Sequence, residues 1–110
     1  MDFRVAIEKN RDGSTEIYFV GVEHWDDFDL ILELLQQEND CKILSNQELL
    51  YTRRADLLKS GVKFQLIQDD MLGNYLYTNE DSAVSILDQL ANKVIKGIKD
   101  KLDKRFERLT

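Results

Sequence analysis

The side chains best suited to chemistry are few and lie far apart along the chain. His24 is the only histidine, and it lies among carboxylates in the segment Glu23-His24-Trp25-Asp26-Asp27. An imidazole beside carboxylates could ligate a divalent metal or act as a base. The same carboxylates are explained by a helix that begins here, because acidic side chains stabilise the positive end of a helix dipole. We therefore expect neither a metal site nor a catalytic site at His24.

Cys41 and the pair Asp69 and Asp70 are the other candidates for chemistry. Cys41 is the only cysteine and follows acidic residues, so we expect a buried and unreactive thiol. The two aspartates could form an acid–base pair or bind a hard cation, but no third ligand is patterned with them. Five glycines, one cysteine and one histidine give no phosphate-binding loop, paired-cysteine motif or Ser-His-Asp arrangement. We expect a protein that is not an enzyme and has no cofactor.

Arg53 and Arg54 are adjacent, so they point to opposite faces if they lie in a strand. One of them then faces the core side and needs a carboxylate. Asp56 and the aspartates of the helix that follows Trp25 are candidates. We expect a structural ion pair, with anion recognition as the alternative.

The elements that must position these residues follow from the hydrophobic pattern. Apolar and polar residues alternate over 2–9 and predict a half-buried strand. Asn, Asp and Gly in 10–14 predict a tight reversal into a second strand over 15–22, which is apolar on both faces and therefore central. Helical spacing of apolar residues then predicts a helix over 26–38.

The stretch 46–59 has two interpretations. Ser45 and Glu48 form a capping-box pattern that favours a helix. A helix would place Arg54 within an arc of apolar side chains, which is unfavourable, so we favour a strand. That strand places three residues on one face: Tyr51, Ala55 and Leu57. A meander then follows, with a turn, a strand, a loop and a short strand over 59–61, 62–66, 69–74 and 75–77.

A long helix is predicted after the capping segment 79–82. If it runs to residue 109, its length is about 45 Å, more than the width of a domain this small. We therefore expect 93–110 to be an overhanging, basic helix end. An apolar seam continues along it and is the predicted surface for self-association, as a homodimer or in a partner's groove: Ile98, Leu102, Phe106 and Leu109.

These patterns predict a single α+β domain over residues 1–110. We expect an antiparallel sheet of four to five strands in the order ββαβββα, packed against two helices of which the C-terminal one is long.

The net charge of −6 is distributed unevenly. Residues 1–92 carry eight Lys and Arg against 18 Asp and Glu, a net charge of −10, whereas residues 93–110 carry seven against three, a net charge of +4. An acidic body repels nucleic-acid phosphate and anionic lipid and attracts basic protein surfaces. The chain has no apolar run of ~20 residues and no secretory signal pattern, and its single cysteine cannot form an internal disulfide. We expect a cytoplasmic protein that binds neither nucleic acid nor membrane.

We expect this chain to be a small acidic protein-binding module. The function we favour is an inhibitor of the bacterial immunity or antitoxin type, which neutralises a basic protein such as a nuclease toxin. The alternative is a self-associating structural or adaptor protein that uses the C-terminal helix. Acidic and aromatic side chains are the predicted partner-binding residues: Glu23, Trp25, Asp26, Asp27, Asp69, Asp70, Tyr75 and Tyr77.

Overall fold

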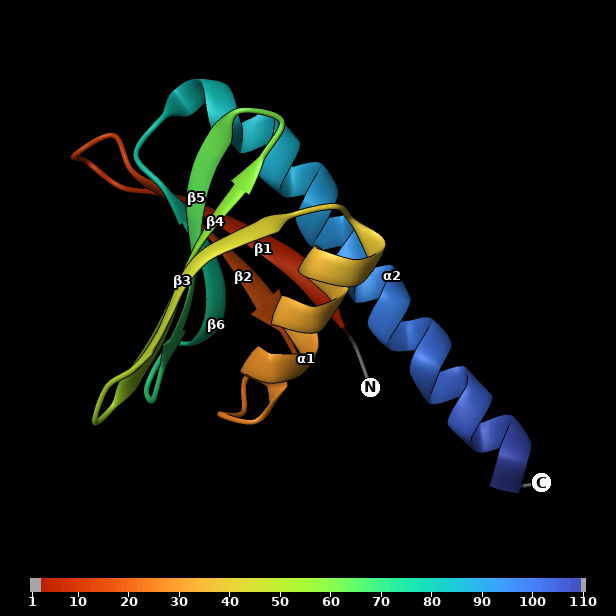
Figure 1. Ribbon diagram of the computed structural model, residues 1–110. Helices are drawn as coiled ribbons and strands as arrows, with labels where there is room; N and C mark the ends of the chain where they lie inside the picture. The colour runs from red at the N-terminus through yellow and green to blue at the C-terminus, as the bar shows by residue number, and fades with distance from the viewer. Residues whose placement is uncertain (1–2, 110) are drawn as a thin grey trace.

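The described part of the chain forms one antiparallel sheet and two helices (Figure 1). The computed structural model describes residues 3–109, and the side chains of residues 3–102. In chain order the elements are β1 (Arg4–Lys9), β2 (Thr15–Val20), α1 (Asp27–Glu33), the π-helical turn η1 (Leu34–Glu38), β3 (Lys42–Glu48), β4 (Thr52–Lys59), β5 (Val62–Asp69), β6 (Gly73–Thr78), the 3₁₀ turn η2 (Asp81–Ala83) and α2 (Val84–Leu109). The predicted α+β class, with a long C-terminal helix, is confirmed.

The strand order in the sheet is β1-β2-β6-β5-β4-β3, and every neighbouring pair is antiparallel. β3 to β6 form a continuous meander, and β6 returns to pair with β2. β2 is therefore an inner strand, as its two apolar faces predicted.

The sheet has one strand more than the upper estimate from the sequence, and the expectation of a single strand over 46–59 is wrong. The stretch contains the end of β3, a turn at residues 49–51 and then β4. The turn is closed by a 2.8 Å hydrogen bond from the Leu49 amide to the Thr52 carbonyl. Tyr51 lies exposed in this turn, whereas Ala55 and Leu57 are buried in β4, so the three do not share a face.

The two helices pack on one face of the sheet and leave the other face open (Figure 1). α2 contacts β1, β2 and β6, and α1 contacts β5. The strands alternate accordingly, with buried apolar side chains on the helix-covered face that include Ile17, Phe19, Ala55, Leu57, Phe64, Leu66 and Leu76. Burying this face supplies the core of the domain.

α2 packs on the core well into its second half. Val94, Ile95 and Ile98 are buried, and Leu102 packs against them. Gly97 allows this helix to approach η1, because a Cβ added there would lie 3.3 Å from both a Leu34 methyl and a Glu38 carboxylate oxygen. The C-terminal end of α2 then runs out beyond the sheet (Figure 1). None of the helices in the described residues is long and apolar enough to cross a membrane.

Candidate protein-binding surface

Polar side chains on the covered face of the sheet anchor the segment that leads into α1. Arg53, Gln68 and Asn74 lie opposite one another on β4, β5 and β6. The Gln68 side-chain amide donates to the Glu23 carbonyl at 3.0 Å. The Asn74 amide donates to the carbonyls of Val22, at 2.9 Å, and His24, at 3.1 Å. Residues 22–24 are therefore fixed against the end of the sheet where β5 turns into β6.

Arg53 fixes the start of α1 at the same end. Its guanidinium donates to both carboxylate oxygens of Asp29, at 2.7 and 3.0 Å, and its side chain is only 11% exposed. The guanidinium carbon lies 4.4 Å from the Phe28 ring centre and 5.6 Å from that of Trp25. The hydrogen bonds from Arg53 lower the pKa of the Asp29 carboxyl. Arg53 thus forms the predicted structural ion pair, with a first-helix aspartate as its partner.

Arg54, on the opposite face of β4, is exposed and hydrogen bonds to Gln47 at 3.4 Å. The two arginines therefore point to opposite faces, as adjacent strand residues must.

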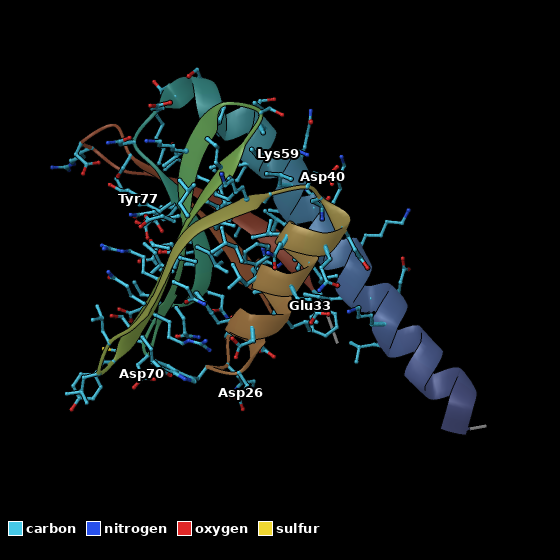
Figure 2. The ribbon with its side chains drawn as sticks, viewed as in Figure 1. Asp26, Glu33, Asp40, Lys59, Asp70 and Tyr77 are labelled. Atoms are coloured by element: carbon cyan, nitrogen blue, oxygen red, sulfur yellow. The ribbon has the colours of Figure 1, made fainter. Side chains whose placement is uncertain are left out.

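These anchors bring together acidic residues that are far apart in the sequence. Glu23 lies against the β5–β6 turn, since its Cβ is 3.1 Å from the position that a Cβ on Gly73 would take. Asp26 and Asp70 lie at the same end of the molecule (Figure 2). All three side chains are exposed. We call this group of residues (Glu23, Asp26 and Asp70) the acidic end.

The other two predicted aspartates lie at the same end but hold local structure. The Asp69 carboxylate accepts hydrogen bonds from the amides of Met71, at 2.8 Å, and Leu72, at 3.1 Å. The Asp27 carboxylate accepts one from the His24 amide at 3.0 Å. Asp69 and Asp70 therefore do not act as a pair: one closes the β5–β6 turn and the other faces solvent.

The two predicted tyrosines lie on β6, on the open face of the sheet. Tyr75 stacks at a tilt against Tyr18, with ring centres 5.0 Å apart, and burial raises its pKa. Tyr77 lies opposite Glu16 and Gln65 on the neighbouring strands. The predicted partner-binding residues thus fall into two groups, and only Trp25 among the aromatic ones lies beside the carboxylates.

Five large apolar side chains at this end were not among the predicted site residues. They are strongly exposed and occupy the β3–β4 and β5–β6 turns: Leu49, Leu50, Tyr51, Met71 and Leu72. We call these five residues the twin-hairpin patch. A usable signal was present in the sequence, because Met71 and Leu72 stand in a segment whose other residues are typical of an exposed turn.

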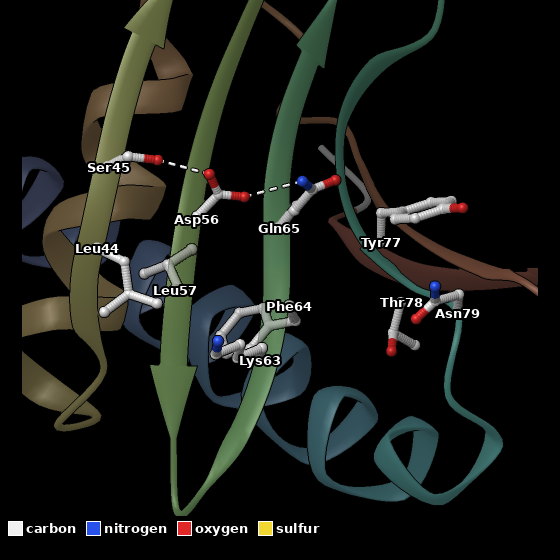
Figure 3. A pocket seen from close by; sticks show the side chains of 10 residues that line it. All are labelled: Leu44, Ser45, Asp56, Leu57, Lys63, Phe64, Gln65, Tyr77, Thr78 and Asn79. Carbon is white, nitrogen blue, oxygen red and sulfur yellow. Dashed lines mark hydrogen bonds between the residues drawn. The ribbon is translucent and has the colours of Figure 1, made fainter.

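A pocket of about 420 Å³ lies on the open face (Figure 3). Its polar centre is Asp56, whose carboxylate accepts hydrogen bonds from the Ser45 hydroxyl and from the Gln65 amide, the latter at 2.8 Å. These bonds lower the pKa of Asp56. The pocket is lined by Leu44, Ser45, Asp56, Leu57, Lys63, Phe64, Gln65, Tyr77, Thr78 and Asn79. Its carboxylate is already bound by the two neighbouring strands, so its first role is to hold the sheet together.

His24 and Cys41 lie in different surroundings. His24 is exposed, and within residues 3–102 no three His, Cys, Asp or Glu side chains converge as metal ligands. Cys41 is buried, and burial raises the pKa of its thiol. The expected burial of Cys41 is confirmed, and burial raises the thiol pKa more than the acidic neighbour Asp40 does.

The predicted self-association seam is changed by the packing of α2. Ile98 is 4% exposed in this chain's own core, and Leu102 packs against that core. Ile98 is therefore largely inaccessible to a second molecule in this structure, and self-association through the rest of the seam stays a prediction. Phe106 and Leu109 lie outside the side chains that the structure describes.

Comparison with known protein families, with curated proteins and with solved structures finds no match to this chain.

Proposed function

We propose that this chain is a protein-binding module that inhibits a basic protein, in the way that immunity proteins neutralise nuclease toxins. The observation that carries the proposal is the acidic end. Glu23 and Asp26, from the segment before α1, and Asp70, from the β5–β6 turn, lie exposed at one end of the domain. Carboxylates held on a rigid scaffold attract a cationic partner over several ångströms and align it before contact.

The charge around this end supports a basic partner. The segments 23–29, 47–54 and 68–74 meet here and carry seven Asp and Glu against two Arg, a net charge of −5. One of the arginines, Arg53, is already paired with Asp29. The field at this end is therefore negative, and it opposes the approach of nucleic acid or of another acidic protein.

The rigidity of the end supports inhibition rather than transient contact. Gln68 and Asn74 are buried and bind three successive backbone carbonyls of residues 22–24. A preformed surface loses little conformational freedom on binding, which favours the tight association that an inhibitor needs.

The test is capture of the partner by the tagged full-length chain, with a charge-matched control. One variant carries Glu23→Gln, Asp26→Asn and Asp70→Asn, and the control carries Glu33→Gln, Asp40→Asn and Glu80→Gln. All six side chains are exposed and both variants lose three negative charges, but only the first alters the acidic end. We expect wild type and control to retain a basic protein that is released by salt, and the acidic-end variant to lose it.

The captured protein is then assayed alone and with the purified chain added. Stoichiometric loss of its activity supports an inhibitor. A partner without a basic surface, or equal retention by both variants, contradicts the proposal. The product of any adjacent reading frame is the first candidate to test directly.

A further inference from the structure

The twin-hairpin patch is formed by two turns that leave the sheet side by side. Thr52 at the start of β4 pairs with Asp69 at the end of β5, so the β3–β4 and β5–β6 turns project from neighbouring positions (Figure 1). The five exposed fractions are 54% for Leu49, 83% for Leu50, 67% for Tyr51, 93% for Met71 and 53% for Leu72. Within residues 3–102, most of the strongly exposed large apolar side chains thus lie in these two neighbouring turns.

The fold does not require these residues. Turns are commonly built from Gly, Asn, Asp and Ser, which satisfy the backbone and face water, yet the β3–β4 turn is Leu-Leu-Tyr. Side chains exposed to this degree contribute little to the domain's own core. Neighbouring exposed apolar side chains with polar ones around them are typical of an interaction site. Apolar residues in a turn where polar residues are usual, in a domain that is otherwise regular, also indicate a functional role.

Charge decides what kind of molecule covers the patch. Glu48 and Asp70 flank the two turns, Glu23 lies against Gly73 at the end of the β5–β6 turn, and Asp26 lies at the same end of the molecule (Figure 2). A second copy of this chain docking through the same patch would bring like charges together, and an anionic membrane would be repelled. The complementary surface is an apolar pocket edged by Lys and Arg side chains.

We propose that the twin-hairpin patch anchors the interface, and that the partner presents an apolar pocket with a cationic edge. This inference rests on the proposed function, and it assigns different roles in binding to the apolar and to the acidic side chains. Leu50 and Met71, the two most exposed side chains, enter the partner's pocket and slow dissociation. The carboxylates accelerate association and contribute most of its dependence on salt.

The test measures binding of a synthetic amphipathic Leu/Lys peptide to the full chain by fluorescence anisotropy and stopped flow. A Ser/Lys peptide keeps the charge without the apolar face, and a Leu/Gln peptide keeps the apolar face without the charge. We expect the Leu/Lys peptide to bind at least roughly 10-fold more tightly than either control peptide, because the Ser/Lys peptide lacks the apolar face and the Leu/Gln peptide lacks the charge. Amide resonances of residues 49–52 and 70–73 should shift when it binds.

Two variants separate the roles. Leu50→Ser with Met71→Ser should weaken Leu/Lys binding roughly 30-fold or more through faster dissociation. Asp26→Asn with Asp70→Asn should slow association and reduce its salt dependence, with little change in dissociation. The control, Ile7→Ser with Leu44→Ser, changes two exposed apolar residues outside the patch and should bind as wild type. Thermal unfolding checks that all three variants are folded, and the patch variant should match wild type because its side chains are exposed.

The following outcomes would contradict the proposal that the twin-hairpin patch anchors the interface. If the patch variant binds as wild type while the acid variant does not, the anchor is wrong and the proposed function stands. If neither added salt nor the Asp26→Asn and Asp70→Asn substitutions change the affinity for the Leu/Lys peptide, the proposed function is wrong as well. The apolar anchor with a cationic edge is also overturned if the Leu/Gln peptide binds as well as the Leu/Lys peptide, if phosphatidylcholine vesicles bind the chain through the patch, or if sedimentation shows a dimer that the patch variant abolishes.

Discussion

Arg53 shows how one side chain connects the sheet to the surface that it positions. It is a charged residue of β4 on the covered face, and it is accommodated there by the Asp29 carboxylate and by the rings of Phe28 and Trp25. Because Asp29 is largely exposed, water screens the ion pair, and the packing of the guanidinium on the rings contributes at least as much as its charge.

At this scale we predict that Arg53→Ala destabilises the domain by roughly 1–3 kcal/mol, and that Asp29→Asn does so by less than about 1 kcal/mol. Arg53→Lys should recover only part of the loss, because an ammonium cannot donate to both carboxylate oxygens in the same planar geometry. Urea unfolding at neutral pH measures all three.

The Asp29 contribution should also depend on pH. The pKa of Asp29 is lower in the folded state than its ordinary value of 3.8. Its stabilisation is therefore complete above that ordinary value and is lost as the pH falls through the folded pKa. Wild type and Asp29→Asn should become equally stable at the acid end of a pH series, and a difference that persists there would contradict the ion pair.

At the scale of the elements, the surface depends on the contact between the β5–β6 turn and the segment before α1. Gly73 has a φ of +86°, and a Cβ there would lie 3.1 Å from both Cβ and Cγ of Glu23 and 3.4 Å from its Cα. A Cβ at Gly73 would therefore fit only if the segment before α1 moved by a few tenths of an ångström, and the positive φ adds backbone strain.

We predict that Gly73→Ala destabilises the domain by about 1–3 kcal/mol and speeds hydrogen exchange of the amides in residues 22–26. Gly13→Ala is the matched control, since Gly13 has a similar φ of +91° but open space where a Cβ would be. Gly13→Ala should destabilise the domain through backbone strain, but it should leave the hydrogen exchange of the amides in residues 22–26 unchanged. Equal effects of the two substitutions on these amides would show that the contact does not hold the segment.

At the scale of the whole molecule, the charge distribution governs which partners can approach. The net charge is −6, and the excess of carboxylates lies in the folded body, while the positive charge is concentrated in α2 from Lys93 onward. The longest extent of the domain is 49 Å, several Debye lengths at physiological salt, so the two ends act as separate electrostatic surfaces.

We predict that the full chain does not bind a short DNA duplex or a single-stranded RNA with a Kd below about 100 µM at moderate salt, because the acidic body opposes phosphate. Fluorescence anisotropy with labelled oligonucleotides measures this, and the Leu/Lys peptide is the positive control. Binding at low micromolar Kd would show that the basic end of α2 dominates, and it would favour a nucleic-acid function over inhibition of a basic protein.

The hydrophobic pattern alone determined much of the architecture. Alternation indicated the strand β1, although its Ile7 is 51% exposed and not buried. The two apolar faces of 15–22 indicated the inner strand β2, and helical spacing indicated the helical segments. These features are local, because a side chain's period along the chain decides which face is buried. The ion pair of Arg53 was also foreseeable, since a charged side chain on a covered face needs an opposite charge nearby.

Only the tertiary structure decided what the surface consists of. The turn at residues 49–51 carries no Gly, Pro, Asn or Asp, so its position follows from the register in which β3 pairs with β4 and β4 with β5. The contact between Glu23 and the β5–β6 turn depends on hydrogen bonds between residues more than 40 positions apart. Sequence determined that the body is acidic; the packing of β5, β6 and the segment before α1 determined which acids lie together, because strand pairing and buried amides act between residues that are distant in the chain.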